Sequence, residues 1–261
     1  MTHKNTKIMA IANQKGGVGK TTTAVNLATA LSACGEQVLL IDFDPQGNAS
    51  TGLGSDVSSR QFNAYQLLIG ACQIEEAIQQ TLVPGLSLIP AIVDLSAVEV
   101  ELSHFQGREF LLSQALKQVE GTYDYVIIDC PPSLGLLTVN ALCAARSVLV
   151  PLQCEFYALE GLAQLLRTIE AVRAGLNPAL ALQGIVLTMY DSRNKLSDMV
   201  EKDVRSHFGA QVYQTVIPRN VRVSEAPSHG KPILMYDLKC TGAQAYVALA
   251  AELLNQERKA A

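Results

Sequence analysis

Six runs of apolar and β-branched residues recur along the chain and predict buried strands. They span residues 7–13, 37–44, 123–129, 147–153, 184–190 and 212–218. Helix-compatible segments lie between them, near residues 20–34, 95–119, 136–145, 159–174, 197–208 and 241–257. Strands that alternate with helices are typical of a largely parallel sheet covered by helices on both faces. The pattern therefore predicts an α/β fold. Because no repeat, low-complexity segment or linker interrupts it, residues 1–261 are expected to form one domain.

The composition of the chain indicates the cellular compartment in which the protein is expected. No apolar run approaches the roughly 18 residues that span a bilayer, and the start from Met1 to Lys7 is polar, unlike a signal peptide. The six cysteines form no C-x-x-C pair, which favours reduced thiols over a disulfide framework or a zinc site. The protein is therefore expected in the cytoplasm.

The net charge of −4 is distributed unevenly. Residues 1–150 contain 13 acidic and 8 basic residues, whereas residues 151–261 contain 11 and 12. Residues 193–239 carry 8 basic and 5 acidic residues, a mild bias for which a solvated mixed surface is the plainer interpretation. Charge alone thus identifies no partner.

The loop after the first predicted strand nearly matches the phosphate-binding pattern G-x-x-x-x-G-K-[ST]. It reads IANQKGGVGKTT, with Gln14 in place of the first glycine and Lys15 as a second lysine that the pattern does not require. In such loops backbone N–H groups surround phosphate oxygens, Lys20 reaches the β- and γ-phosphates, and the Thr21 hydroxyl binds Mg²⁺. The candidate nucleotide-binding residues are Lys15, Gly16, Gly17, Val18, Gly19, Lys20, Thr21 and Thr22. A glycine-rich turn before a helix is the structural alternative, but the order of strand, loop and helix favours a P-loop NTPase-like fold.

Aspartates follow two other predicted strands. Asp42 and Asp44 end the run VLLIDFD, and Asp129 ends YVIID. Ligands of open α/β sheets bind at the carboxyl ends of the strands, so these side chains are expected near the phosphates. Asp129 is the candidate Walker B ligand of magnesium, with Asp42 as a second metal candidate, and Asp44 is the candidate for orienting the attacking water. Taken singly, each would more often be a helix cap or turn residue.

Four sequence blocks occur together in the chain: KGGVGKTTTAVNLA, LLIDFDPQGN, VIIDCPPSLG and IPRNVRVSEAPSHGKPI. With them the chain resembles the ParA/Soj family of chromosome- and plasmid-partition ATPases, within the deviant Walker A class that includes MinD. The similarity runs from about residue 7 to about residue 254. It implies that Lys15 crosses to the nucleotide of a second subunit, so that two ATP molecules lie between facing monomers of a homodimer. Such a lysine would stabilise phosphate charge in trans, as an arginine finger does.

The resemblance also implies positions for the nucleoside and for DNA. The candidate base- and ribose-contacting residues are Pro218, Asn220, Met189 and Glu155, of which Glu155 reaches either a ribose or the partner subunit. The candidate DNA-binding residues are Arg193, Arg219 and Arg222. The alternatives are that Asn220 is a simple turn residue and that the three arginines are ordinary surface residues.

The resemblance implies a small, Soj-like partition ATPase with ATP and Mg²⁺ as cofactors. The ATP-bound homodimer is expected to bind double-stranded DNA of the nucleoid without sequence preference, and a ParB/Spo0J-type partner to stimulate slow hydrolysis. Both chromosome and plasmid remain possible cargo. Because the first strand begins near residue 7, no N-terminal helix-turn-helix is expected. The segment ALAAELLNQERKAA reads as a packed helix with a polar tail, so no membrane binding is expected.

Two other classes of function stay open. A MinD-like positioning ATPase would bind membranes. An iron-sulfur carrier of the nitrogenase iron protein type would need paired cysteines across a dimer axis, for which Cys130 or Cys154 are the candidates. Neither cysteine has the glycine-rich surroundings expected of cluster ligands.

Overall fold

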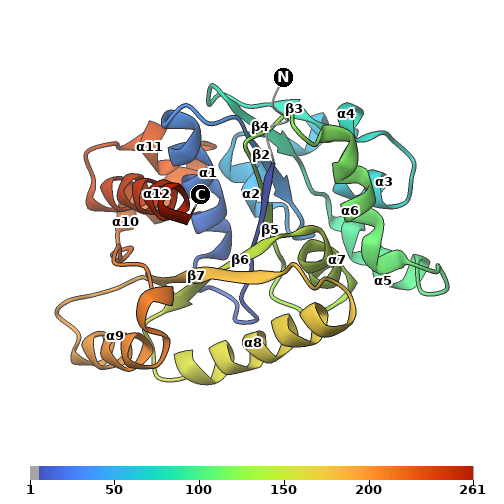
Figure 1. Ribbon diagram of the computed structural model, residues 1–261. Helices are drawn as coiled ribbons and strands as arrows, with labels where there is room; N and C mark the ends of the chain where they lie inside the picture. The colour runs from blue at the N-terminus through green and yellow to red at the C-terminus, as the bar shows by residue number, and fades with distance from the viewer. Residues whose placement is uncertain (1–5, 261) are drawn as a thin grey trace.

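The computed structural model describes residues 6–260, and a seven-stranded sheet runs through its centre (Figure 1). The strands are β1 (Lys7–Ile11), β2 (Val38–Asp42), β3 (Gln79–Gln80), β4 (Leu86–Ile89), β5 (Tyr125–Asp129), β6 (Ser147–Gln153) and β7 (Ala181–Thr188). Their order is β3-β4-β2-β5-β1-β6-β7, and every neighbouring pair is parallel except β3 with β4. The predicted α/β sheet is therefore confirmed. Residues 1–5 and 261, part of the polar start and tail considered above, lie outside the described residues.

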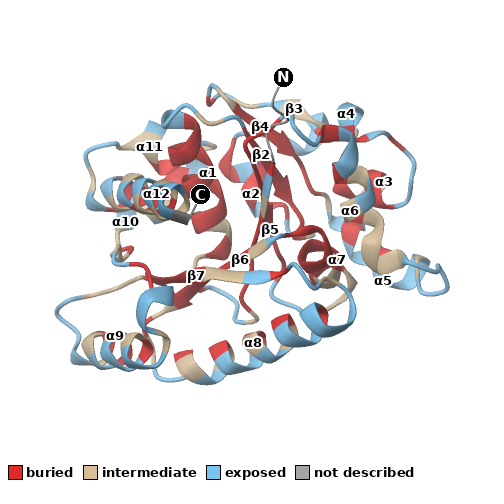
Figure 2. Cartoon of the chain, in the orientation of Figure 1, coloured by how far each residue is buried: buried red, intermediate tan, exposed pale blue. Residues whose placement is uncertain are grey.

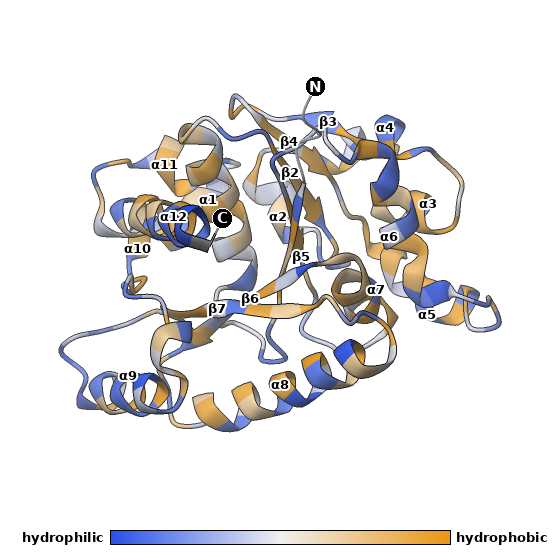
Figure 3. Ribbon diagram, in the orientation of Figure 1, coloured by the Kyte–Doolittle hydropathy of each residue, from blue (hydrophilic) through white to orange (hydrophobic). Residues whose placement is uncertain are grey.

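Helices cover both faces of the sheet (Figure 1). They are α1 (Lys20–Ala33), α2 (Asn48–Gly52), α3 (Ala64–Leu68), α4 (Ile74–Ala77), α5 (Val98–Glu101), α6 (Leu111–Leu116), α7 (Leu136–Ala144), α8 (Ala158–Gly175), α9 (Lys195–Phe208), α10 (Val221–Glu225), α11 (Ile233–Tyr236) and α12 (Thr241–Ala260). One face is covered by α1, α2, α11 and α12, and the other by α3, α4 and α6 to α9. The central helix α7 is mostly hydrophobic, whereas the peripheral α9 is mostly hydrophilic (Figure 3).

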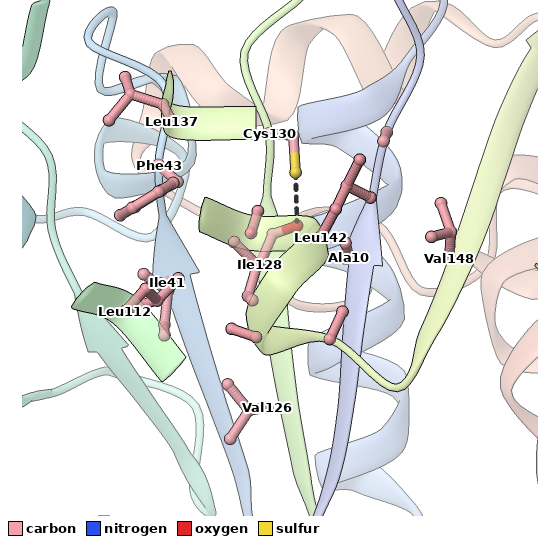
Figure 4. Packing of buried hydrophobic residues seen from close by; sticks show 14 of the residues in the cluster. Ala10, Ile41, Phe43, Leu112, Val126, Ile128, Cys130, Leu137, Leu142 and Val148 are labelled. Atoms are coloured by element: carbon pink, nitrogen blue, oxygen red, sulfur yellow. Dashed lines mark hydrogen bonds between the residues drawn. The ribbon is translucent and has the colours of Figure 1, made fainter. Parts of the chain in front are cut away.

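The central strands β2 and β5 are apolar up to their final aspartates because both of their faces are buried (Figure 2). Successive side chains of a strand point to opposite faces of the sheet. In β5, Val126 and Ile128 pack beneath α7, while Tyr125 and Ile127 pack beneath α1 and α12. Figure 4 shows the first of these two clusters, in which Leu142 of α7 lies close to Ile128 and Ala10. The sheet thus separates two hydrophobic cores. This explains why apolar and polar residues do not alternate along the central strands.

Two predicted elements are wrong. Residues 212–218 form no strand; they make only isolated bridges, from Val212 to Ile185 and from Pro218 to Tyr190. The expected helix over residues 95–119 is broken into α5, α6 and short 3₁₀ turns, with Gly107 in a left-handed conformation between them. The sequence pattern also did not predict the edge strand β3, its neighbour β4 or the short helices α2, α3, α4, α10 and α11.

The sheet reverses its direction of growth beside β1, and this places the site. From β1 the chain moves to β2, on the far side of β5, whereas β6 adds to the opposite edge of β1. At such a switch point the loops that follow neighbouring strands diverge and leave a crevice. Asp129 is in register with Ile11 of β1 and with Asp42 of β2, so three strands end together there.

Candidate functional site

The phosphate loop joins β1 to α1, and its glycines make the turn. Gly17 and Gly19 have φ angles of 76° and 87°, in the left-handed region where a side chain would be strained. Gly19 comes immediately before α1, so the free N–H groups of the first helical turn face the loop. A glycine-rich turn before the N-terminus of a helix is the geometry that suits an anion.

Lys20 is buried inside this loop. Its ammonium donates a hydrogen bond of 2.9 Å to the carbonyl oxygen of Lys15, and the residue is only 6% exposed. Burial lowers the pKa of Lys20, and the nearby Asp129 and Asp44 offset part of that effect. The lysine is therefore held within the loop, next to the carboxylates at the strand ends.

Asp129 ends β5 and is fully buried. Neither of its carboxylate oxygens accepts a hydrogen bond of ordinary geometry from a described residue. Burial and then the neighbouring Asp42 raise the pKa of Asp129 well above its usual range, although the Thr21 hydroxyl partly opposes the rise. A buried carboxylate with unused oxygens, beside a threonine hydroxyl, provides the oxygen ligands that Mg²⁺ prefers.

Asp42 has a different environment, although it lies beside Asp129. One of its oxygens accepts hydrogen bonds from the backbone N–H and hydroxyl of Ser50, at 2.7 and 2.6 Å, and the other accepts from the N–H of Asp44 at 3.4 Å. Burial raises the pKa of Asp42 to about 6, against these hydrogen bonds. Since its oxygens already have protein donors, the geometry favours Asp129 as the metal ligand and makes Asp42 a support for α2.

Asp44 sits on the turn between β2 and α2. Its carboxylate accepts from the N–H of Gln46 at 3.0 Å, and its carbonyl accepts from the N–H of Gly47 at 2.9 Å. The side chain thus caps its own turn, as the structural alternative anticipated. The turn also keeps Asp44 close enough to Lys20 to influence its pKa.

The second lysine of the loop contacts an acidic residue outside the loop. Lys15 is exposed, and its ammonium forms an ion pair with Glu155, which follows β6. The N–H of Lys15 donates to the side chain of Asn13 at 3.0 Å, and Asn13 in turn donates to the carbonyl of Pro151 at 2.8 Å. Asn13 therefore fixes the start of the loop against β6, a role that the sequence analysis did not assign.

A cavity of about 350 Å³ adjoins the loop and brings together the residues expected to contact the base. Met189, Pro218 and Asn220 line it, with Gly19 and Thr22 at the end next to the phosphate loop. The Asn220 side chain is also a cap: it accepts from the N–H of Arg222 at 2.9 Å and donates to the Thr241 hydroxyl at 2.8 Å. Asn220 thus lines the cavity, as a base-contacting residue would, and also caps the start of α10, as a turn residue would.

The three arginines lie on exposed segments, and two of them form ion pairs with acidic side chains. Arg193 pairs with Asp191 at 2.9 Å. Arg222 pairs with Glu225 at 3.0 Å and lies 3.8 Å from Asp237. Arg219 lines the rim of the base cavity. The structure brings Arg219 and Arg222 near each other around α10, with Arg193 on a separate loop before α9.

The cysteines considered for a cluster are both buried. The Cys130 thiol donates to the carbonyl of Ile128 at 3.8 Å beneath α7 (Figure 4), and Cys154 is 6% exposed. Burial raises the pKa of both thiols, to about 12 for Cys154. A ligand shared across a dimer axis has to reach the surface, so this geometry does not favour a bridging cluster. Within residues 6–260, no group of three or more His, Cys, Asp or Glu side chains is arranged to hold a metal ion.

Comparison with known proteins gives the chain its relatives. Residues 6–182 match the family model described as an AAA domain. The chromosome partitioning protein ParA of Caulobacter vibrioides strain NA1000 / CB15N is 62% identical over 254 residues, which cover 97% of this chain and 95% of the relative. The sporulation initiation inhibitor protein Soj of Bacillus subtilis strain 168 is 52% identical, over 95% of this chain and 98% of its own.

A solved structure shares the fold. It is named cobyrinic acid a,c-diamide synthase from Mycobacterium smegmatis with bound ATP analog and magnesium, and has a TM-score of 0.86 at 41% identity. The match covers 98% of this chain and 97% of that one. None of the helices within residues 6–260 combines the length and the hydropathy that a bilayer-spanning segment requires.

Proposed function

The chain belongs to the ParA/Soj family of partition ATPases, and on that premise we propose that it acts as one ATPase domain whose ATP-bound state is a DNA-binding homodimer. The observation that carries this proposal is the difference in environment between the two lysines of the phosphate loop. Lys20 is buried beside the carboxylates, whereas Lys15 is exposed and paired with Glu155 outside the loop. One lysine serves the bound nucleotide and the other is available to a second subunit.

ATP would occupy the phosphate loop and the adjoining cavity, with its adenine between Met189 and Pro218. The unused oxygens of Asp129 and the hydroxyl of Thr21 would hold Mg²⁺. The bound ion supplies positive charge that stabilises the developing charge on the phosphates. The support for this assignment is the buried, unpaired Asp129 carboxylate, together with a relative of the same fold whose structure is described with an ATP analog and magnesium.

Hydrolysis needs a group that orients water against the γ-phosphate. Asp44 lies just past the carboxyl end of β2 on a turn next to Lys20, where its carboxylate accepts from the N–H of Gln46. Its carboxylate would accept a proton of the attacking water and direct a lone pair toward phosphorus. Lys15 of the partner subunit would add positive charge at the same phosphates.

DNA binding would use Arg219 and Arg222 around α10, with Arg193 on the neighbouring loop. Two such surfaces, aligned in a dimer, give an acidic protein a locally cationic face. A ParB-type partner would stimulate hydrolysis, as the resemblance to Soj implies, and the protein would then act at the nucleoid on chromosome or plasmid cargo.

A MinD-like membrane role has less support in the C-terminal helix. Tyr246, Leu249 and Leu253 of α12 are buried and pack with α1. An amphipathic helix that inserts into a bilayer needs its apolar side for the lipid.

Gel filtration with ATP and with ADP, followed by DNA binding of the same samples, tests the proposal. We expect dimers only with Mg²⁺ and ATP, and DNA binding only by those dimers. A monomer under every nucleotide condition, or equal DNA binding with ADP, would overturn it. Liposome flotation in ATP distinguishes the MinD-like alternative.

A further inference from the structure

The turn that carries Asp44 is held by an arginine outside all four sequence blocks. The guanidinium of Arg60 is buried, and the residue is 6% exposed. Its Nη1 donates to the carbonyls of Gly47 and Ala91, at 3.4 and 3.0 Å. Its Nη2 donates to the Thr51 hydroxyl and the Ser55 carbonyl, at 2.9 and 2.7 Å.

These contacts fix both ends of α2. Gly47 immediately precedes the helix, while Thr51 lies in its last turn and Ser55 shortly beyond it. The middle of the same helix is held by Asp42, through the N–H and hydroxyl of Ser50. Because the N–H of Gly47 donates to the carbonyl of Asp44, a clamp on Gly47 also constrains the turn of Asp44.

Gly47 has no room for a side chain under this clamp. Its φ angle is 63°, and an added methyl carbon would lie 2.5 Å from Nη1 of Arg60 and 3.1 Å from the Ala91 oxygen. A left-handed conformation and direct guanidinium contact together require glycine at this point. The arginine and the glycine therefore form one unit.

Burying the charged guanidinium of Arg60 costs desolvation free energy, which the contacts to the short helix α2 have to offset. Among the described residues Arg60 forms no ion pair with a carboxylate, and its Nε has no hydrogen-bond partner. Burial lowers the pKa of Arg60, with only partial opposition from the charges of Asp42 and Asp56. An apolar side chain of similar volume would avoid the desolvation cost. It could not, however, donate to two acceptors from each of two terminal nitrogens that lie in one plane, as the guanidinium does.

We propose that Arg60 is a positioning residue for ATP hydrolysis, which clamps α2 and thereby holds Asp44 in its working place. The proposal rests on the role proposed above for Asp44. Arg60 itself touches neither the phosphate loop nor the base cavity.

Arg60→Lys tests the clamp, because lysine keeps the charge but cannot reach acceptors on both ends of α2. We expect kcat to fall about tenfold, the size of effect that a modest loss of transition-state positioning produces, while KM for ATP changes less than about threefold. Hydrogen exchange of the amides in residues 47–55 should accelerate, with the strands of the sheet unchanged. Arg205→Lys is the control: Arg205 likewise donates to a main-chain carbonyl, that of Gln214, but it lies on α9 and its other acceptor is the Glu201 carboxylate, so kcat should stay the same.

Thr51→Val is a second variant that removes one acceptor of Nη2 and keeps the arginine. Its loss of kcat should largely disappear in the Arg60→Lys background, because both changes break the same contact. Unchanged kcat in Arg60→Lys, fully additive effects of the two changes, or equal losses of kcat and ATP affinity would overturn the clamp. Asp44→Ala separates the two proposals. If it hydrolyses ATP normally, the role of Asp44 is wrong; if it stalls while Arg60→Lys is normal, only the clamp is wrong.

Discussion

The ammonium of Lys15 is paired with the carboxylate of Glu155 in the same chain. The lysine proposed to reach a partner's nucleotide is therefore held first by its own subunit, next to β6. Exposed pairs of this kind contribute little to stability, so a phosphate group can replace the carboxylate at small cost.

Lys15→Ala should spare ATP binding by one subunit and remove ATP-dependent dimers. A charge-assisted contact to phosphate is worth about 1.5 to 3 kcal/mol, which corresponds to a change of about ten- to a hundredfold in the dimer constant. Analytical ultracentrifugation with ATP measures the dimer, and a fluorescent nucleotide measures binding.

Two variants serve as controls for Lys15. Lys20→Ala should weaken nucleotide binding itself. Glu155→Gln frees Lys15 without removing it: dimers at least as stable as in the wild type would assign Glu155 only to holding Lys15, and weaker dimers would assign it to the ribose or the partner subunit. Undiminished ATP-dependent dimers of Lys15→Ala would contradict the proposal that Lys15 leaves Glu155 to contact the nucleotide of the partner subunit.

Asp44→Ala should bind ATP, dimerise and stall before hydrolysis, because the carboxylate orients water and holds no phosphate. The trapped dimer should persist on DNA after excess competitor is added. Single-turnover hydrolysis and DNA dissociation are the measurements. A loss of ATP affinity as severe as that of Lys20→Ala would instead make Asp44 a main ligand of the nucleotide or its metal.

Arg222→Ala should weaken DNA binding of the ATP dimer equally on unrelated sequences. With about three arginines per subunit the dimer makes about six phosphate contacts, which predicts a slope of log K against log[salt] of about −5. Removing Arg222 from both subunits should flatten the slope by about 2. The exposed pair of Arg222 with Glu225 has to open, which costs little.

A salt titration on two unrelated duplexes measures this effect. Arg173→Ala is the matched control, since Arg173 is likewise exposed and pairs with an acid three residues away, but at the far end of α8. An unchanged slope for Arg222→Ala, or a strong preference for one duplex, would argue against this surface.

The thiols give a prediction about pH. Burial raises the pKa of Cys143 to about 11 and that of Cys154 to about 12, from 9.0. The folded state keeps these thiols protonated, so their contribution to stability is complete below pH 9 and is lost as pH rises toward 11 to 12. At pH 8 a thiol reagent should label the exposed Cys34 and reach Cys143 and Cys154 only after unfolding. Rapid labelling of Cys154 in the folded protein would contradict this assignment.

The parts of the fold that the sequence predicts are those decided by local pattern. Strand β6 was predicted with its exact bounds, and β1, β2, β5 and β7 within a few residues, because each is an apolar run buried on two sides. The run at residues 212–218 has the same composition but lies at the edge beyond β7. It makes single bridges only, and Pro218 has no N–H to continue a ladder.

The candidate site divides in the same way. The phosphate loop and Asp129 are identifiable because motif residues and strand ends are local features. The supports of the site depend on contacts between distant parts of the chain: Asn13 bonds Pro151, and Arg60 bonds Ala91. An asparagine at the end of a predicted strand, or an arginine between predicted elements, carries no sign of such a contact, so only the folded chain reveals it.

The hydrogen bond from Lys20 to the carbonyl of Lys15 gives the phosphate loop an order of events. An arriving triphosphate competes for the Lys20 ammonium, because charge-assisted bonds to phosphate are stronger than bonds to a neutral carbonyl. As Lys20 turns to the phosphates, the main chain at Lys15 loses its donor, and the rim of the loop gains freedom to rearrange. In the proposed dimer, nucleotide binding to one subunit would therefore come first, and docking of the second subunit against the rearranged loop would follow from it.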